Sequence, residues 1–351
     1  MKKFAKKVIA VVCAAVILGA AAVLPGCGSP SGDVVYFFNW QEFINPQVID
    51  MFYEEYGITV IVDAFDSNEA MYVRVTRQGG YDLLNPSEYM VQRMRLEGLL
   101  SPLNFDNIPN FRYIDERFKN IPADPEGRYF VPYMWGTLGI LYDATRVYEP
   151  VTSWSALWDE RYAGQIFMYD SVRDTMAVAL KKLGFSLNTT NIDELNAAVE
   201  LLLEQRPLVQ AFIGEPVKDA MINGEGILAV LYSGCALWTM MQNPNLNFVT
   251  PIEGSNIFVD GLVIPHNARN QEGAEKFINF LSRPDIAAMN SEYIFYTTAN
   301  RAALELIDPE LLAHPVFWPS DEVLDRTEFF EDLGDFRSEF DSAFTRVLIG
   351  R

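Results

Sequence analysis

The chain has 351 residues, half of them apolar, and its formal net charge of −20 at pH 7 comes from 27 Lys and Arg against 47 Asp and Glu. This acidity argues against a nucleic-acid partner or an anionic membrane surface as the main ligand, because both require clustered basic side chains. The length is sufficient for two domains of ordinary size.

The first residues have the pattern of a bacterial export signal. Four lysines fall within residues 1–7, and no charged residue occurs from Val8 to Val23. As a helix that apolar run would be about 24 Å long, which is short for a permanent transmembrane span. Residues 1–26 are therefore predicted to be a cleaved signal peptide. Its removal takes away four lysines and no acids, so the net charge changes from −20 to −24.

The leader ends in Leu24-Pro25-Gly26-Cys27, which resembles the lipobox of bacterial lipoproteins. By that resemblance Cys27 becomes the lipidated first residue of the mature chain, and the Gly- and Ser-rich residues 27–32 form a flexible tether. Only Cys235 remains as a further cysteine, so the mature chain cannot form an internal disulfide. We expect an extracytoplasmic protein, anchored by lipid at a cell surface or in a periplasm.

The run that begins at Val34 is typical of a β-strand and ends in Asn39-Trp40-Gln41-Glu42-Phe43. Ligands of open α/β sheets bind at the carboxyl ends of strands. Two aromatic rings around a carboxylate suit an organic cation, because ring faces attract the cation and the carboxylate pairs with it. Alternatively, Trp40 and Phe43 are ordinary core residues and Glu42 is an acid in the first turn of a helix. This segment alone does not decide between the two.

Strands and helices alternate after this opening strand. The expected elements are helices over 46–55, 67–75 and 87–96, and strands over 58–65 and 81–84. A helix stop at Gly57 and helix starts at Ser67 and Ser87 mark their boundaries. This alternation predicts a parallel sheet covered by helices.

Two long apolar runs, 129–142 and 257–265, are predicted to cross between domains. The other elements expected in the second half are strands over 165–169, 227–232 and 247–250, and helices over 174–183, 192–205, 271–281, 284–291 and 336–348, with one more beginning at Ser233. Two crossings predict two discontinuous α/β domains joined by β-strand hinges. We place lobe 1 at 33–137 plus 262–312 and lobe 2 at 138–261 plus 313–351, both approximately.

Motifs for catalysis, cofactors or metals are weak. The segment 224–229 matches G-x-G-x-x-A, but it precedes a predicted strand instead of following one, so it fails as a dinucleotide site. The only histidines, His266 and His314, are expected at the surface, and Cys235 alone cannot supply a thiolate zinc site. The sequence therefore predicts no catalytic residue, no cofactor and no metal.

A series of ordered segments resembles the substrate-binding proteins of bacterial polyamine ABC transporters, the spermidine/putrescine-binding proteins. In one-letter code they are FNWQEF (38–43), SNEAMY (67–72), YDL (81–83), PSEY (86–89), VPYMWG (131–136), TSW (152–154), LW (157–158), KLG (182–184), DGLVIP (260–265) and FLSRPD (280–285). The resemblance covers essentially the whole mature chain. It implies a two-lobed, type II-like periplasmic-binding-protein fold, a monomer that closes on a linear polyamine and delivers it to ABC permease subunits.

The resemblance also implies a binding site in the cleft between the lobes. It assigns aromatic contacts to Trp40, Phe43, Tyr232, Phe258 and Tyr296, carboxylates to Glu42, Asp174 and Asp260, and polar contacts to Ser87 and Tyr89. Asp174 stands where the family has a Glu. Three further positions change chemical type: Gln41 replaces a small hydroxyl residue, Ser171 replaces an acid and Phe330 falls near a Gln. Because of these changes, another organic cation or small polar solute is the alternative to putrescine or spermidine.

The residues themselves support Asp260 as a cation partner. It is the one carboxylate in the apolar run 257–264, where an unpaired buried charge would be costly. The alternatives are that backbone amides cap Asp260, that Asp174 is a helix first-turn acid beside Arg173, and that the aromatic residues are plain core.

Overall fold

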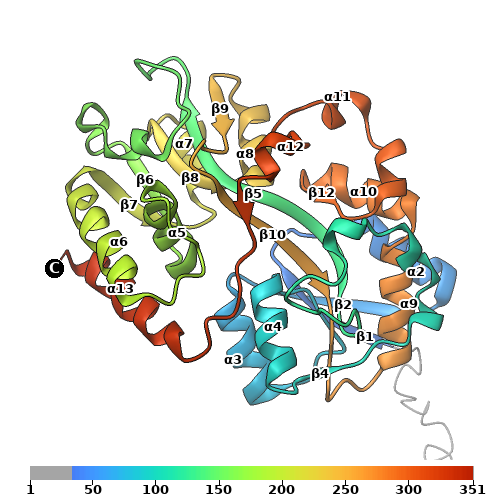
Figure 1. Ribbon diagram of the computed structural model, residues 1–351. Coiled ribbons are helices and arrows are strands. Elements are labelled where there is room, and N and C mark those ends of the chain that lie inside the picture. Colours follow the sequence, from blue (N-terminus) through green and yellow to red (C-terminus); the bar gives the residue numbers. More distant parts are fainter. Residues whose placement is uncertain (1–33, 351) are drawn as a thin grey trace, which may run out of the picture. The chain divides into compact units, whose positions relative to one another are not determined.

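The computed structural model describes residues 34–350 as a mixed α/β protein (Figure 1). The signal peptide, Cys27 and the tether lie outside the described residues. Within those residues, none of the helices combines the length and apolar character that a membrane span requires.

The first sheet is parallel and has the strand order β2-β1-β3. Its strands are β1 (Val34–Trp40), β2 (Thr59–Phe65) and β3 (Leu83–Leu84), and they alternate along the chain with α2 (Pro46–Tyr56), α3 (Asn68–Gln78) and α4 (Glu88–Leu96). Gly57 ends α2 in the left-handed conformation with φ 68°, and Ser67 caps α3 by accepting a hydrogen bond from the Ala70 amide. The predicted alternation and these two boundaries are therefore confirmed.

The larger sheet is built around β5 (Val131–Asp143) and has the order β13-β10-β5-β8-β6-β7, while β9 and β12 also pair with β5. The remaining strands are β4 (Leu100–Ser101), β6 (Ile166–Tyr169), β7 (Val209–Ile213), β8 (Leu228–Tyr232), β9 (Leu246–Val249), β10 (Ser255–Leu262), β11 (Ile264–Pro265), β12 (Thr297–Thr298) and β13 (Thr327–Glu328). The prediction of one strand over 257–265 is wrong in one respect. The strand is interrupted at Val263, which forms an isolated bridge with Leu84 of the first sheet.

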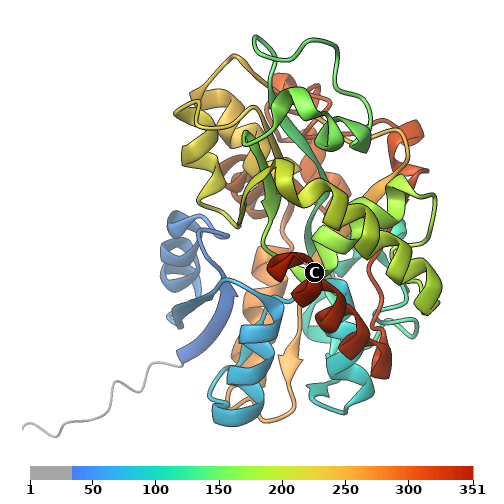
Figure 2. The ribbon, with the colours of Figure 1, turned by 90° about the vertical axis from the view of Figure 1, so that its left-hand side faces the viewer.

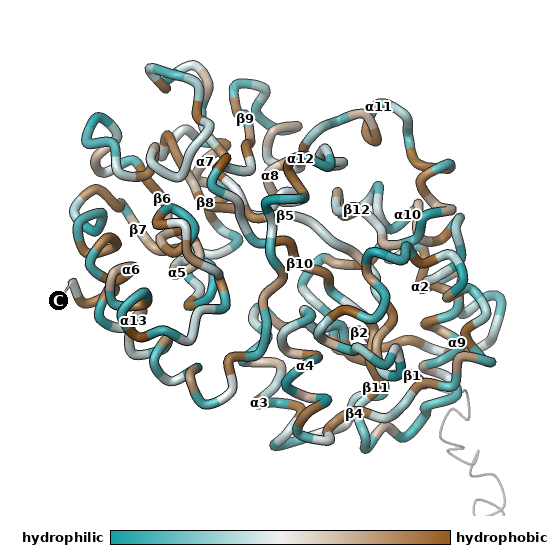
Figure 3. The backbone as a smooth tube through the Cα atoms, in the orientation of Figure 1, coloured by the Kyte–Doolittle hydropathy of each residue, from teal (hydrophilic) through white to brown (hydrophobic). Residues whose placement is uncertain are grey.

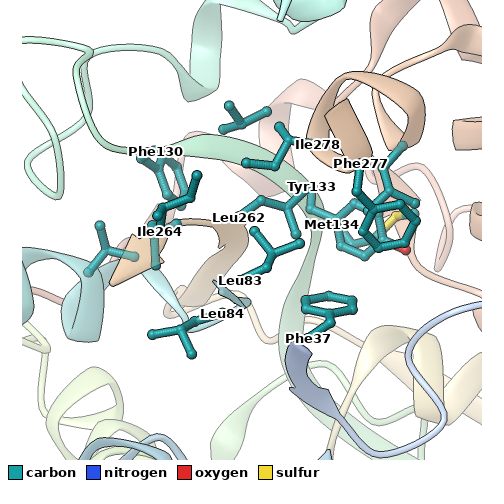
Figure 4. Close-up of a cluster of buried hydrophobic side chains, with 14 of the residues drawn as sticks. Phe37, Leu83, Leu84, Phe130, Tyr133, Met134, Leu262, Ile264, Phe277 and Ile278 are labelled. Carbon is teal, nitrogen blue, oxygen red and sulfur yellow. The ribbon is translucent and has the colours of Figure 1, made fainter. Parts of the chain in front are cut away.

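Strand β5 runs through two hydrophobic cores. Trp135 packs in the core of the first sheet, whereas Leu138 and Ile140 pack in a second core with β6, β8 and α5. Figure 4 shows the first core, where Phe37, Leu83, Tyr133, Met134 and Leu262 come together from β1, β3, β5 and β10. Figure 3 shows the hydrophobic residues along β10. The long strand thus carries the chain from one core to the other.

Helices cover the second core. Figures 1 and 2 both show the C-terminal helix α13 beside α6. The helices of the second half are α5 (Val172–Lys182), α6 (Ile192–Gln205), α7 (Val217–Ile222), α8 (Ser233–Gln242), α9 (Gln271–Leu281), α10 (Pro284–Ile294), α11 (Pro309–Leu312), α12 (Asp321–Leu324) and α13 (Arg337–Ile349). Short 3-10 turns lie at Phe105–Asn107, Pro109–Tyr113, Glu116–Phe118, Trp154–Trp158, Glu160–Tyr162, Arg206–Leu208, Arg301–Glu305 and Gly334–Phe336.

Candidate functional site

Asp260 lies in β10 and is only 4% exposed. Its Oδ1 accepts a hydrogen bond of 2.7 Å from the Ser87 hydroxyl, which itself accepts one of 3.1 Å from the Asn68 amide group. Ser87 stands at the N-terminus of α4, as predicted, but its side chain does not cap the helix. The hydroxyl donates to Asp260 instead, and no backbone amide of residues 34–350 donates to the Asp260 carboxylate, in contrast to the alternative interpretation.

Burial raises the pKa of Asp260 to about 8, although the Ser87 hydroxyl and the nearby Trp40 indole act to lower it. The buried Trp40 Nε1 has no hydrogen-bond acceptor among residues 34–350. Within the same residues, Asp260 forms no ion pair. The carboxylate is therefore a buried acid without a positive partner, an arrangement that favours binding of a cation.

Asp174 provides a second buried carboxylate, 5% exposed, in the first turn of α5. Ser171 caps this helix by accepting a hydrogen bond of 3.4 Å from the Asp174 amide, and the Tyr232 hydroxyl donates to Asp174 Oδ1 at 2.5 Å. Burial raises the pKa of Asp174.

Asp174 is a first-turn acid beside Arg173, as the alternative interpretation had it, and the Arg173 charge acts to lower its pKa, but the two side chains form no ion pair. The Arg173 guanidinium donates to the backbone carbonyls of Glu331 and Leu187 and to the side chain of Asn188. Asp174 therefore lacks an ion pair in the described part of the chain. One of its carboxylate oxygens accepts from the Tyr232 hydroxyl, and the carboxylate is otherwise available to a cation.

Four of the predicted aromatic side chains form one continuous series. Tyr232 meets Phe258 with ring centroids 5.0 Å apart, Phe258 meets Tyr296 at 5.5 Å, and Tyr296 meets Phe43 at 5.4 Å. The first two pairs are edge-on, with interplanar angles of 79°, and the Tyr296–Phe43 pair is tilted at 57°. Edge-on packing is typical of favourable aromatic pairs. The rings come from four separate segments of the chain, so the fold brings together residues that are far apart in sequence.

The aromatic series is core and candidate site at once. Phe43, Phe258 and Tyr296 are buried, and Tyr232 is partly buried, so the plain-core interpretation is correct about their packing. The series also begins at the Tyr232 ring whose hydroxyl contacts Asp174. Trp40 lies outside the series and packs on Phe65, with ring centroids 4.5 Å apart.

Gln41 and Glu42 lie in the exposed turn that follows β1. Glu42 adopts φ 55°, a left-handed conformation that is uncommon for a residue with a Cβ. The Asn39 side chain donates to the Phe43 carbonyl at 3.1 Å and closes the turn. Glu42 is thus not an acid in the first turn of a helix, and its carboxylate faces solvent in this structure.

Tyr89 and Phe330 lie together at another edge of the candidate site. Their rings meet edge-on at 6.1 Å, and the Tyr89 hydroxyl donates to Glu69 at 3.0 Å. The Arg173 guanidinium lies 4.4 Å from the centre of the Phe330 ring. Phe330 is buried in a small core with Ala177 and Leu187. Its side chain therefore packs apolar surface and cannot replace a polar contact.

Glu88 is a buried acid that the sequence analysis did not single out. One carboxylate oxygen accepts from the Val259 amide at 3.0 Å and the other from the Phe330 amide at 3.2 Å. Burial raises its pKa to about 8, and the neighbouring Asp260 adds to this rise. The motif PSEY contains Glu88, but no local pattern indicates partners about 170 and 240 residues away. Glu88 ties the start of α4 to β10 and to the C-terminal segment.

Among residues 34–350, no three His, Cys, Asp or Glu side chains are grouped so that they could hold a metal ion. The candidate site combines buried carboxylates with aromatic rings, and this combination suits an organic cation.

The family model for bacterial extracellular solute-binding proteins matches residues 81–326. The chain belongs to this family. The spermidine/putrescine-binding periplasmic protein of Salmonella typhimurium is 36% identical over 355 residues, covering 100% of both chains. The putrescine-binding periplasmic protein PotF of Escherichia coli is 30% identical, and the match covers 86% of this chain and 87% of PotF.

Solved structures of the same family share the fold. A Listeria monocytogenes protein, provisionally named for a spermidine/putrescine ABC transporter, is 37% identical with a TM-score of 0.87, covering 91% of this chain and 100% of the other. The spermidine/putrescine substrate-binding protein PotD of Streptococcus pneumoniae is 35% identical with a TM-score of 0.82, covering 91% and 99%. The predicted periplasmic-binding-protein fold is therefore confirmed.

Proposed function

We propose that this protein is an extracytoplasmic receptor that captures a linear polyamine, putrescine or spermidine, in a cleft between two lobes and delivers it to the permease of an ABC transporter. One observation carries the proposal. Two buried carboxylates, Asp174 and Asp260, lack an ion pair within residues 34–350. The aromatic series from Tyr232 to Phe43 meets Asp174 through the Tyr232 hydroxyl, and its member Phe258 lies on the same strand, β10, as Asp260. Ammonium groups would pair with the carboxylates, while rings would pack on the methylene chain.

The relatives support the same ligand class, since both curated relatives described above are named for polyamine binding. The switch of β5 from one core to the other between Trp135 and Leu138 supports our lobe boundary near residue 137. Binding of one ligand by residues of both lobes would stabilise the closed arrangement. In this proposal the protein acts as a monomer, carries out no catalysis, and has no nucleic-acid partner.

A thermal-shift panel tests the ligand class directly. Putrescine, spermidine, spermine and cadaverine are compared with amino acids and sugars at equal concentrations. A ligand present at 100 times its Kd stabilises a protein by about 2.7 kcal/mol, which gives a visible rise in Tm. Stabilisation by a neutral or acidic solute, and by none of the amines, would point to a different solute for the same fold. Chemical change of any ligand during incubation would instead indicate an enzyme.

We also propose that Cys27 is lipidated and anchors the protein to a membrane. The leader sequence supports this, and a structure of the same family from Treponema pallidum, 27% identical with a TM-score of 0.82, is named as a lipoprotein. Cys27→Ala should accumulate as uncleaved precursor or leave the membrane fraction in a host that processes lipoproteins. Palmitate labelling that survives the substitution would show that the anchor is elsewhere.

A further inference from the structure

The segment 329–332, between β13 and α13, connects the two hydrophobic cores. It has neither helix nor strand structure. The Phe329 side chain packs against the first core, whereas Leu333, directly after the segment, lies in the second. Figure 1 shows this segment in red, where it passes α4 on its way to α13. We call residues 329–332 the strap.

Asn188 and Arg173 hold one side of the strap. The Asn188 side chain donates to the Phe329 carbonyl at 2.8 Å and accepts from the Glu331 amide, also at 2.8 Å. The Arg173 guanidinium donates to the Glu331 carbonyl at 2.8 Å. These contacts come from α5 and from the loop that follows it, so they fix the strap to the part of the chain that forms the second core.

Glu88 and Gln92, one turn apart on α4, hold the other side of the strap. The Phe330 amide donates to Glu88 Oε1 at 3.2 Å, and the Asp332 amide donates to Gln92 Oε1 at 2.8 Å. Helix α4 packs in the first core. Successive residues of the strap are therefore hydrogen-bonded alternately to the two parts of the chain.

Glu88 also borders the cation-binding carboxylate of the candidate site. Its second oxygen accepts from the Val259 amide at 3.0 Å, and the preceding residue, Ser87, donates its hydroxyl to Asp260. Ser87 and Asp260 form an isolated β-bridge as well. Glu88 therefore connects the strap to the stretch of β10 that carries Asp260.

We propose that Glu88 and Gln92 are positioning residues that hold the strap against α4 and thereby keep the two lobes closed on a ligand bound at Asp260. This inference rests on the proposed function, in which α4 belongs to lobe 1 and the strap to lobe 2. Opening of the lobes breaks both hydrogen bonds, and a bound amine leaves only after opening. The two contacts therefore slow dissociation, and they do so equally for every amine that the site accepts.

The deciding variant is Gln92→Ala, because Gln92 contacts the strap and does not contact Asp260. Stopped-flow tryptophan fluorescence gives the association and dissociation rates of putrescine and spermidine. The dissociation rates of both amines should rise by about fivefold, the scale of one partly buried hydrogen bond. The association rates should stay the same. Glu88→Gln should act in the same direction, since its amide end is a donor and leaves an acceptor for only one of the two backbone amides.

Glu275 offers a matched control for Glu88. Both glutamates are 2% exposed. Glu275 accepts from the Asn104 amide at 3.0 Å and from the Asn107 side chain at 2.6 Å. All three residues lie in lobe 1, so these bonds do not join the lobes. Glu275→Gln should lower Tm and leave the dissociation rates unchanged, which separates a general loss of stability from a loss of closure.

The outcomes separate this inference from the proposed function. If the wild type binds the amines and Gln92→Ala releases them at the wild-type rate, the strap does not hold the lobes closed, although the polyamine function stands. Faster release from Glu88→Gln alone would place the effect at Val259 and Asp260, and it overturns the inference too. If the wild type binds neither amine, the proposed function fails and this inference fails with it. Should Glu88→Gln fail to fold, Gln92→Ala still decides.

Discussion

Replacing Asp260 by asparagine tests the central feature of the site. Asparagine has nearly the same size, and its side-chain oxygen can still accept the hydrogen bond from Ser87 that the structure shows at 2.7 Å. The substitution therefore removes the charge and leaves the packing around β10 largely intact. Any loss of affinity then reports the interaction between the carboxylate and a positive group of the ligand.

The size of the effect follows from the burial of this carboxylate. An ion pair at ~4 Å has a gross Coulomb energy of about 4 kcal/mol at an effective dielectric constant near 20. Desolvation of the two ions cancels part of this energy. Loss of one partner in a buried pair typically costs 2 to 5 kcal/mol. We expect Asp260→Asn to weaken putrescine binding by about 2 to 4 kcal/mol, which is roughly 30- to 700-fold in Kd.

Isothermal titration calorimetry measures this loss, with Asp82→Asn as the control. Asp82 is also buried, but it accepts hydrogen bonds from the Tyr36 amide at 3.0 Å and the Arg269 amide at 2.8 Å, away from the aromatic series. Its substitution should lower the free energy of unfolding without changing the affinity of the folded protein. A loss below about 0.5 kcal/mol for Asp260→Asn, well under the cost of breaking a buried charge pair, would refute the role we give to this carboxylate.

Further measurements follow from the same geometry. Because the folded protein raises the pKa of Asp260 from 3.8 to about 8, its contribution to stability is present below pH 3.8 and is lost as the pH rises toward 8. Urea unfolding between pH 5 and 8 should therefore show a steeper loss of stability for the empty wild type than for Asp260→Asn, and equal slopes would contradict the shift. Calorimetry at pH 7 in buffers of different ionisation enthalpy should detect proton release when putrescine binds, and its absence would mean that Asp260 stays protonated. Gly136→Ala should weaken binding of either amine, since an added Cβ would lie 2.6 Å from the Ser233 hydroxyl, 3.0 Å from the Phe258 ring and 3.1 Å from the Tyr296 ring, and so would displace the series. Unchanged affinity would show that the series need not keep its position. In competition titrations, putrescine should bind at least as tightly as spermidine. Ser171→Asp, which keeps a good helix cap, should shift the preference toward spermidine. If spermidine binds the wild type more than about tenfold more tightly, a difference of ~1.4 kcal/mol, the three carboxylates suffice for a triamine.

Local patterns were enough to predict much of the fold. The helices over 192–205 and 271–281 have the predicted boundaries, because each has a continuous apolar face and a polar cap residue at its start. The strand β7 (Val209–Ile213) and the six-residue helix α7 were not predicted. Both are short and only partly buried, so tertiary contacts determine them more than their own residue pattern does.

The site was predicted less completely than the fold. Asp260 could be recognised from the sequence, because a lone acid in an apolar strand is conspicuous. Its partner Ser87 is 173 residues away, and the local pattern indicated a helix cap instead of a contact with Asp260. Glu88 could not be recognised at all, since an acid at a helix start is ordinary at the surface of a protein.

Burial of Asp260 affects both the empty protein and the complex. With a pKa of about 8, this side chain is mostly protonated at pH 7 in the empty protein. An ammonium group can pair with it only after the proton leaves, which reduces the apparent affinity at pH 7 by about tenfold relative to a carboxylate that is already ionised. Once ionised, the same carboxylate lies in a poorly solvated site where the charge pair is strong. A neutral solute gains nothing from the loss of this proton, because it offers no charge to compensate the buried carboxylate. The burial that destabilises an unpaired Asp260 is therefore also what makes the site selective for cations.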